Sequence, residues 1–124
     1  GGRPYGELPG YLKGFDVCLL PFRNTSLVAH VSPTKTPEYL AGGRPVVSTP
    51  IPDVVADYGE VVRVARTPEE FIRACGEALE GSPDPAILNA EARRRASTWD
   101  QIAERMDRLV TEVLGSVPKR GQDA

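Results

Sequence analysis

Three short apolar runs, separated by segments with helical patterning, restrict this chain to few architectures. The runs are residues 16–20, 45–48 and 61–64, and Pro21 closes the first of them. Short apolar runs of this kind are typical of strands that are buried on both faces of a parallel sheet. Strands that alternate with helices imply crossover connections between parallel neighbours. The sequence therefore predicts an α/β fold with a Rossmann-like parallel sheet flanked by helices.

Helices are predicted before each strand and after the last one. Residues 8–13, 37–41 and 54–57 precede the first, second and third strands. After the third strand, Thr67 provides an N-cap, with a proline at the first helical position and a glutamate three residues past the cap. The apolar stripe predicted for this helix consists of Phe71, Ile72, Cys75, Ala78 and Leu79, and the helix is expected to end at residues 81–83.

The C-terminal third of the chain is predicted to be helical as well. Residues 85–96 are polar and rich in alanine and arginine, which predicts a weaker helix, and a last helix opens at residues 97–99. Its apolar face consists of Ile102, Ala103, Met106, Leu109, Val110, Val113 and Leu114. Gly115 is expected to end it, so that residues 1–115 form the domain and residues 116–124 a flexible tail. Trp99 is expected to dock this helix onto a neighbouring domain.

Composition narrows the function classes. The 124 residues fit one globular domain. Fifteen basic and seventeen acidic residues are spread along the chain and give a net charge of −2. This charge distribution argues against a nucleic-acid-binding surface. Cys18 and Cys75 lack a metal-ligand spacing and are expected to be buried free thiols. No run approaches the length of a membrane span and the start lacks a signal-peptide plan, so a cytoplasmic protein is expected.

The beginning of the chain predicts a fragment. The chain begins with Gly1 and not with an initiator methionine, and the residues that follow already have the pattern of a folded domain. Three strands with several helices make half of a doubly wound sheet. One edge of the sheet should therefore lack its covering strands, and we expect an N-terminal portion to be missing and the bare edge to favour self-association.

The segment with the clearest chemistry is residues 32–49, which places a helix N-terminus beside the end of a strand. Prolines at 33 and 37 suit a first helical turn, which leaves the backbone N–H groups of Thr34, Lys35 and Thr36 to form an anion site beside a lysine. Glu38 lies about a turn deeper, where its carboxylate could accept hydrogen bonds from the vicinal diol of a ribose.

Local chemistry leaves a structural alternative open for this segment. Residues 32–35 could merely cap a helix, and Glu38 could be a first-turn acid that compensates the helix dipole. Gly42 and Gly43 are expected to supply the left-handed conformation that ends the helix, and Pro45 then directs the chain into the next strand. Asp53 and Asp57 are four apart, but Asp53 after Pro52 is better interpreted as a helix start than as half of an acid–base pair.

The order of these motifs resembles the C-terminal, donor-binding domain of GT-B glycosyltransferases of bacterial cell-surface polysaccharide synthesis. The resemblance rests on residues 4–5, 8–9, 15–22 and, above all, 32–49. In that family a glutamate five residues before the glycine of a Gly-x-Pro turn binds the ribose of the sugar nucleotide. Glu38, Gly43 and Pro45 occupy these positions here.

The resemblance also implies roles for the loop before this helix. Backbone amides there face the donor diphosphate or sugar in the family, which maps onto the stretch from Ser32 to Thr36. Many retaining members place a second glutamate eight positions before the first, where this chain has His30. His30 is a candidate contact for sugar or phosphate, or else an ordinary loop residue, and it is not assigned as catalytic. The family's phosphate-binding arginine and lysine and its acceptor domain would lie upstream of Gly1.

The resemblance implies that the parent protein transfers a sugar from a nucleoside diphosphate sugar to a glycan or lipid-linked acceptor, in the cytoplasm at the inner membrane surface. No metal, no cofactor and no catalytic residue of this chain is implied, and the chain alone is expected to be inactive. Two alternatives remain, a sugar-nucleotide epimerase of GT-B fold and a non-catalytic α/β module that binds phosphate or a protein partner. The base, the sugar, the acceptor and the stereochemical outcome depend on groups outside this segment.

Overall fold

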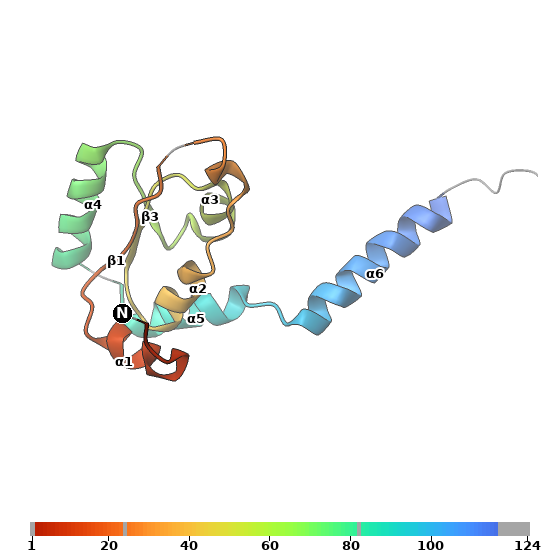
Figure 1. Ribbon diagram of the computed structural model, residues 1–124, viewed down its shortest axis with the longest axis horizontal. Helices are drawn as coiled ribbons and strands as arrows, with labels where there is room; N and C mark the ends of the chain where they lie inside the picture. The colour runs from red at the N-terminus through yellow and green to blue at the C-terminus, as the bar shows by residue number, and fades with distance from the viewer. Residues whose placement is uncertain (1, 24, 82, 117–124) are drawn as a thin grey trace, which may run out of the picture.

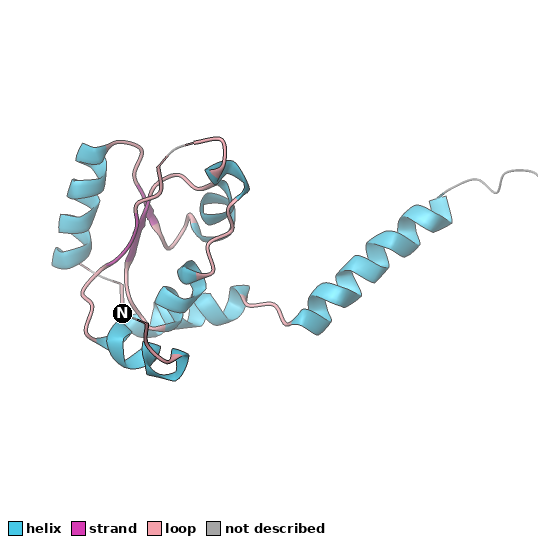
Figure 2. Cartoon of the chain, viewed as in Figure 1, coloured by secondary structure: helices cyan, strands magenta, loops and turns pink. Residues whose placement is uncertain are grey.

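The computed structural model describes residues 2–23, 25–81 and 83–116, and within them the chain forms a three-stranded parallel sheet (Figures 1 and 2). The strands lie in the order β1 (Cys18–Leu20), β2 (Val46–Ser48) and β3 (Arg63–Val64). Leu19 lies opposite Val47, which in turn lies opposite Arg63. The predicted α/β fold with a parallel sheet is confirmed, although each strand is shorter than its apolar run.

Six α-helices and two single turns of 3-10 helix accompany the described sheet. The helices are α1 (Leu8–Lys13), α2 (Lys35–Ala41), α3 (Pro52–Tyr58), α4 (Pro68–Glu80), α5 (Pro85–Arg95) and α6 (Trp99–Ser116), and the 3-10 turns are η1 (Tyr5–Glu7) and η2 (Val28–His30). The predicted bounds of α1 are confirmed, and α2 and α3 begin two residues earlier than predicted. Proline in a first helical turn loses no hydrogen bond, so neither Pro37 nor Pro52 delays the start.

Helices cover both faces of the sheet, and each face has its own buried cluster. Strand side chains alternate between faces, so Val46 and Val47 point in opposite directions, and both are buried. On the face of Val47 the cluster is completed by Ala74 and Ala78 of α4. The larger cluster on the other face joins β1 and β2 to α1, α2, α3 and α5, and consists of Leu12, Cys18, Leu20, Leu40, Val46, Ile51, Val54, Val62, Leu88 and Ala92. Figure 1 shows α4 on one side of the strands and α2, α3 and α5 on the other.

The start of α4 confirms the predicted cap. The Thr67 hydroxyl accepts a hydrogen bond from the Glu70 N–H at 3.2 Å, and the Glu70 carboxylate accepts one from the Arg66 N–H at 2.7 Å. The predicted apolar stripe is wrong at two positions, because Ile72 is 73% exposed and Leu79 is also exposed. The small residues of α4 face the sheet instead, which lets the helix lie close to β2.

The outer edge of β1 is open within the described part of the chain. β1 pairs with β2 alone, and Leu19 is 45% exposed although its partner Val47 is fully buried. The difference arises because α4 lies over β2 and β3 and leaves the Leu19 face of β1 uncovered, whereas Cys18 and Leu20 on the other face are buried. This agrees with the expected uncovered sheet edge.

Helix α5 contributes more to the fold than its polar sequence predicted. The Asp84 carboxylate caps it by accepting a hydrogen bond from the Ala86 N–H at 2.8 Å. Leu88 and Ala92, one turn apart, are buried in the larger cluster. Asn89 donates to the carbonyl of Ala41 at the end of α2. The helix predicted over residues 85–96 is confirmed within one residue, and Leu88 and Ala92 are the side chains by which it joins the larger cluster.

Helix α6 extends away from the rest of the molecule (Figure 1). Thr98 and Gln101 cap its start reciprocally, with hydrogen bonds of 2.9 and 3.2 Å between each backbone N–H and the other side chain. The helix continues through Gly115 to Ser116, so the prediction that Gly115 ends it is wrong. Residues 117–124, most of the predicted tail, lie outside the described residues. Among the helices of the described ranges, none is long and apolar enough to cross a membrane.

Candidate functional site

Helix α2 positions the predicted site, and glycine fixes its end. The chain is already helical at the N-cap residue Thr34, with φ −64° and ψ −17°. At the other end Gly43 has φ +68°, the left-handed conformation predicted for it, whereas Gly42 has φ −75° and stays helical, so the prediction is wrong for Gly42. A Cβ on Gly43 would lie 2.7 Å from the Cβ of Pro85, so a side chain there would collide with the start of α5. The Gly43 turn thus allows α2 and α5 to lie side by side.

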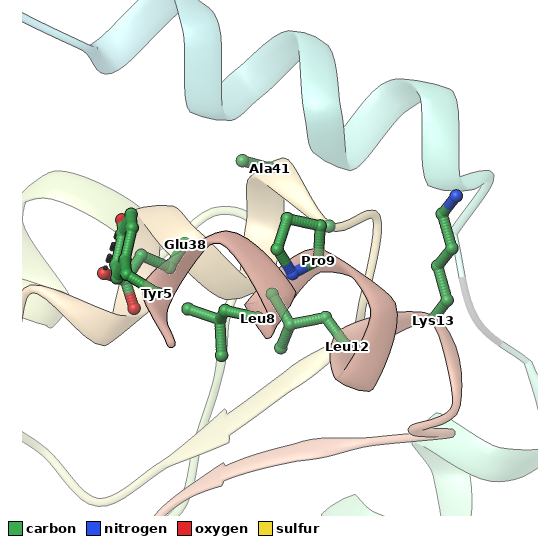
Figure 3. Close-up of a pocket in the computed structure, with 8 residues that line it drawn as sticks. Tyr5, Leu8, Pro9, Leu12, Lys13, Glu38 and Ala41 are labelled. Atoms are coloured by element: carbon green, nitrogen blue, oxygen red, sulfur yellow. Dashed lines mark hydrogen bonds between the residues drawn. The ribbon is translucent and has the colours of Figure 1, made fainter. Parts of the chain in front are cut away.

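The carboxylate of Glu38 is held at both oxygens. Lys35 Nζ donates to Oε2 at 2.9 Å. The Tyr5 hydroxyl donates to Oε1 at 3.2 Å (Figure 3). Only 20% of the Glu38 side chain is exposed, against about half of the Lys35 side chain. The hydrogen bond and the negative charge of Glu38 raise the pKa of Lys35, so this lysine stays charged at neutral pH.

Glu38 forms part of the wall of a cavity between α1 and α2. The cavity has a volume of about 330 Å³ and mostly apolar walls, with the carboxylate of Glu38 and the ring of Tyr5 at one end and Lys13 at the other (Figure 3). It is lined by Tyr5, Leu8, Pro9, Leu12, Lys13, Glu38, Ala41 and Gly42. Apolar walls with a few fixed polar groups are typical of small-molecule sites of this size.

The loop before α2 differs from the prediction in one respect. Ser32, Thr34 and Lys35 are exposed, as an anion site requires, but Thr36 is fully buried. The Thr36 N–H donates to the Pro33 carbonyl at 3.3 Å, so the prediction that it is a free donor is wrong. The helical conformation of Thr34 closes this turn, because α2 begins at Lys35 and not at Pro37. The buried Thr36 hydroxyl has no hydrogen-bond partner among the described residues.

His30 lies apart from the Glu38 cavity. It ends the 3-10 turn η2, it is exposed, and it does not line the cavity. Asp53 lies in the first turn of α3, which confirms its interpretation as a helix start.

A second hollow of about 380 Å³ lies where the three strands end. It is lined by residues that follow β1, β2 and β3 and by the first turns of α4, namely Pro21, Phe22, Thr49, Pro50, Ala65, Arg66, Thr67, Pro68, Phe71 and Ile72. Thr49 joins the ends of β1 and β2 beside this hollow, because the Thr49 N–H and hydroxyl both donate to the Leu20 carbonyl, at 3.1 and 3.3 Å. Carboxyl ends of parallel strands are the usual ligand side of doubly wound sheets.

Sequence reasoning did not identify Tyr5 as a site residue. Tyr5 and Glu38 are 33 residues apart, and only the packing of α1 against α2 brings them together. The two cysteines are free thiols, and the prediction that they are buried is confirmed for Cys18 but wrong for Cys75, which is half-buried. Burial raises the pKa of Cys18 to about 11. Within the described ranges no group of His, Cys, Asp or Glu side chains is arranged to hold a metal ion.

Comparison with known proteins finds one informative similarity. No protein-family model and no solved structure matches the chain. The chain is 32% identical over 104 residues to a protein of Bacillus subtilis (strain 168) named "Putative teichuronic acid biosynthesis glycosyltransferase TuaH". The match covers 76% of this chain and 25% of TuaH, so the chain spans about a quarter of the length of this relative. Over three quarters of its length, therefore, this α/β chain is similar to one part of TuaH.

Proposed function

We propose that this chain is the sugar-nucleotide-binding portion of a GT-B glycosyltransferase. The complete enzyme would transfer a sugar from a nucleoside diphosphate sugar to a glycan or lipid-linked acceptor in cell-surface polysaccharide synthesis, on the cytoplasmic side at the inner membrane. The similarity to TuaH and the parallel α/β sheet support this assignment. Because the match covers a quarter of TuaH, the acceptor-binding domain would be supplied by a different segment of the enzyme.

The single observation that supports donor binding best is the placement of Glu38. Its carboxylate lies in the wall of an apolar cavity, with one oxygen bonded to Lys35 and the other to Tyr5. In the proposed complex the two hydroxyls of a ribose replace these donors on Glu38, and the base lies against the apolar wall formed by Leu8 and Pro9. A carboxylate that is already oriented loses little entropy on binding such a diol.

The leaving diphosphate would lie at the start of α2. The exposed backbone of Ser32 and Thr34, the ammonium of Lys35 and the positive end of the short helix would stabilise the charge that grows as the glycosidic bond breaks. Thr36 would support this turn from beneath, because its side chain is fully buried. His30, exposed at the end of η2, is proposed as a contact for the sugar or a phosphate.

No residue of this chain is proposed to act as nucleophile or base. Reaction geometry in the proposed enzyme is set in the cleft between two domains, so the isolated chain would bind donor without turnover. A flat surface around Glu38 would have favoured a protein-interaction module instead. The cavity beside Glu38 favours a small-molecule ligand.

The test is a titration of the chain with UDP-, GDP-, dTDP- and ADP-sugars, followed by calorimetry and by the ligand-induced shift in melting temperature. We expect weak, saturable binding of one nucleotide family and at least tenfold weaker binding by the Glu38→Gln variant, because hydrogen bonds to a charged group contribute about 1.5–3 kcal/mol. Glu69→Gln is the matched control, since Glu69 is also a first-turn acid but on α4.

Two results would contradict the proposal at different levels. Equal binding by wild type and Glu38→Gln would remove Glu38 from the ribose site while leaving donor binding intact. The absence of binding to every nucleotide sugar, both in this chain and in a longer polypeptide that contains it, would overturn the assignment as a glycosyltransferase.

A further inference from the structure

The side chain of Tyr5 is fixed at its hydroxyl, but its ring is exposed. The hydroxyl donates to Glu38 Oε1 at 3.2 Å, and the ring lines the cavity beside this carboxylate (Figure 3). Tyr5 is nevertheless 74% exposed. The rings of Tyr11 and Tyr58 each lie under an arginine guanidinium, at 5.7 and 5.8 Å, and Tyr39 packs against the larger cluster. In the described structure, therefore, Tyr5 presents an uncovered aromatic face at the candidate site, which suits a ligand that stacks.

The covalent structure of a nucleotide identifies the group that would reach this ring. In the proposed complex Glu38 binds the 2′- and 3′-hydroxyls of a ribose. The base is carried by C1′, which is bonded directly to C2′, whereas the diphosphate leaves the ribose at C5′. The base is thus attached beside a hydroxyl that Glu38 holds, and the Tyr5 ring extends from the same carboxylate. One face of the base lies against Leu8 and Pro9 in the proposed complex, so its other face is left for the ring of Tyr5.

The turn that carries Tyr5 allows the ring to move. Tyr5 begins the single 3-10 turn η1, whose N-cap residue Pro4 makes no side-chain capping hydrogen bond, and none of the residues of η1 is buried. A Cβ added at Gly6 would meet no atom within 4 Å. Few packing contacts hold such a segment in one position. The ring can therefore turn from Glu38 onto a base without disturbing the buried clusters.

We propose that Tyr5 stacks on the base of the bound nucleotide and that its hydroxyl competes with the ribose for Glu38. This inference rests on the proposed function, because it requires a ribose on Glu38. When the nucleotide binds, the Tyr5 hydroxyl leaves Oε1, a ribose hydroxyl takes its place, and the ring lies against the free face of the base. Such stacking accepts any base, since every base has a π-face. The ring of Tyr5 strengthens nucleotide binding, whereas its hydroxyl weakens it.

The first experiment separates the ring from the hydroxyl. Calorimetry measures the dissociation constant of whichever of UDP, GDP and ADP the wild-type chain binds most tightly. Tyr5→Phe keeps the ring without the hydroxyl and should bind this nucleotide about threefold more tightly than wild type. Tyr5→Leu is apolar but has no ring, and it should bind about tenfold more weakly than Tyr5→Phe.

Tyr11→Leu is the matched control for the loss of a tyrosine ring. Tyr11 is an exposed tyrosine on α1 that does not line the Glu38 cavity, so this variant should bind the nucleotide as wild type does. The melting temperature of each variant, followed by circular dichroism, verifies that the chain is folded.

Two further measurements report on stacking itself. Ribose 5-phosphate has no base, so Tyr5→Phe and Tyr5→Leu should bind it alike. In NMR spectra of the bound nucleotide, the base protons should shift upfield with wild type and with Tyr5→Phe, because an aromatic ring lies over them. This shift should be absent with Tyr5→Leu.

The inference is overturned if Tyr5→Phe and Tyr5→Leu bind the nucleoside diphosphate with equal affinity. Equal losses in both variants would mean that the hydroxyl merely positions Glu38. Equal and unchanged affinities, together with weak binding by Glu38→Gln, would leave the donor site in place without Tyr5. The absence of binding to all three nucleotides, in this chain and in a longer polypeptide that contains it, would overturn the proposed function and this inference with it.

Discussion

At the scale of single residues, Gly43 controls how closely two helices approach. Its φ of +68° costs a residue with a side chain about 1–2 kcal/mol, and a Cβ there would lie 2.7 Å from Pro85. We expect Gly43→Ala to lower the free energy of unfolding by at least 2 kcal/mol in urea denaturation. Gly76→Ala is the control, because Gly76 lies within α4 with open space around its Cα, and this change should stabilise the chain by about 0.5–1 kcal/mol. Equal effects of both changes would contradict this account of the Gly43 turn.

The buried thiol of Cys18 predicts a loss of stability at alkaline pH. Burial raises its pKa to about 11 against the opposing effect of the nearby Arg44 charge, and an unfolded thiol ionises near pH 9. Between these values the unfolded state binds fewer protons than the folded state, so stability falls as pH rises. By pH 11 we expect a loss on the order of 2 kcal/mol.

Comparison with Cys18→Ala isolates this effect. That variant should be less stable at neutral pH because of the cavity it creates, but its free energy of unfolding should fall less steeply between pH 9 and 11. Tyr39 and Tyr58 also have raised pKa values because of burial, and they contribute equally to both proteins. Parallel pH profiles for the two proteins would show that Cys18 ionises in the folded state as easily as in the unfolded state.

At the scale of elements, α5 is the helix whose contribution is most easily tested. Leu88 is 1% exposed and contacts the larger cluster, whereas its neighbour Ile87 is exposed. We expect Leu88→Ala to lower the free energy of unfolding by about 3 kcal/mol, and Ile87→Ala by less than about 1 kcal/mol. Urea denaturation of the two variants measures both values. Similar losses of stability for both variants would mean that α5 is not held against α2 by the face that carries Leu88.

The elements that sequence reasoning found are those with local signals. The three apolar runs predicted the strands, and Thr67 with Glu70 predicted the start of α4 at the correct residue. The same reasoning predicted the wrong face for Ile72, because which flank of α4 meets the sheet depends on where the strands lie. It also did not predict which side chains of α5 are buried, because their burial depends on a partner helix more than forty residues earlier in the chain.

In the candidate site, too, the features with local signals were predicted and those that depend on packing were not. Glu38 was found from its place in a motif, and the left-handed Gly43 from the turn that follows it. The cavity and the hydrogen bond from Tyr5 were not found, because they exist only once α1 packs against α2. The closed turn at Thr36 was missed because it depends on the backbone conformation of a single residue, Thr34.

At the scale of the whole molecule, the body and α6 are expected to be energetically separate. None of the described side chains of α6 belongs to either buried cluster. We expect a chain that ends at Ala96 to melt within about 3 °C of the 124-residue chain, measured by circular dichroism. A drop of more than about 6 °C would show that α6 stabilises the body.

The position of Trp99 decides what an optical experiment on this protein can detect. It is the sole tryptophan of the sequence, and its indole is largely exposed on α6. Its emission maximum in the folded monomer should therefore already be that of a hydrated indole, and melting of the sheet should barely shift it. Denaturation followed by tryptophan fluorescence would miss the main unfolding event. Absorbance of the half-buried Tyr39 and Tyr58, which pack against the larger cluster, is the optical signal that reports on the body.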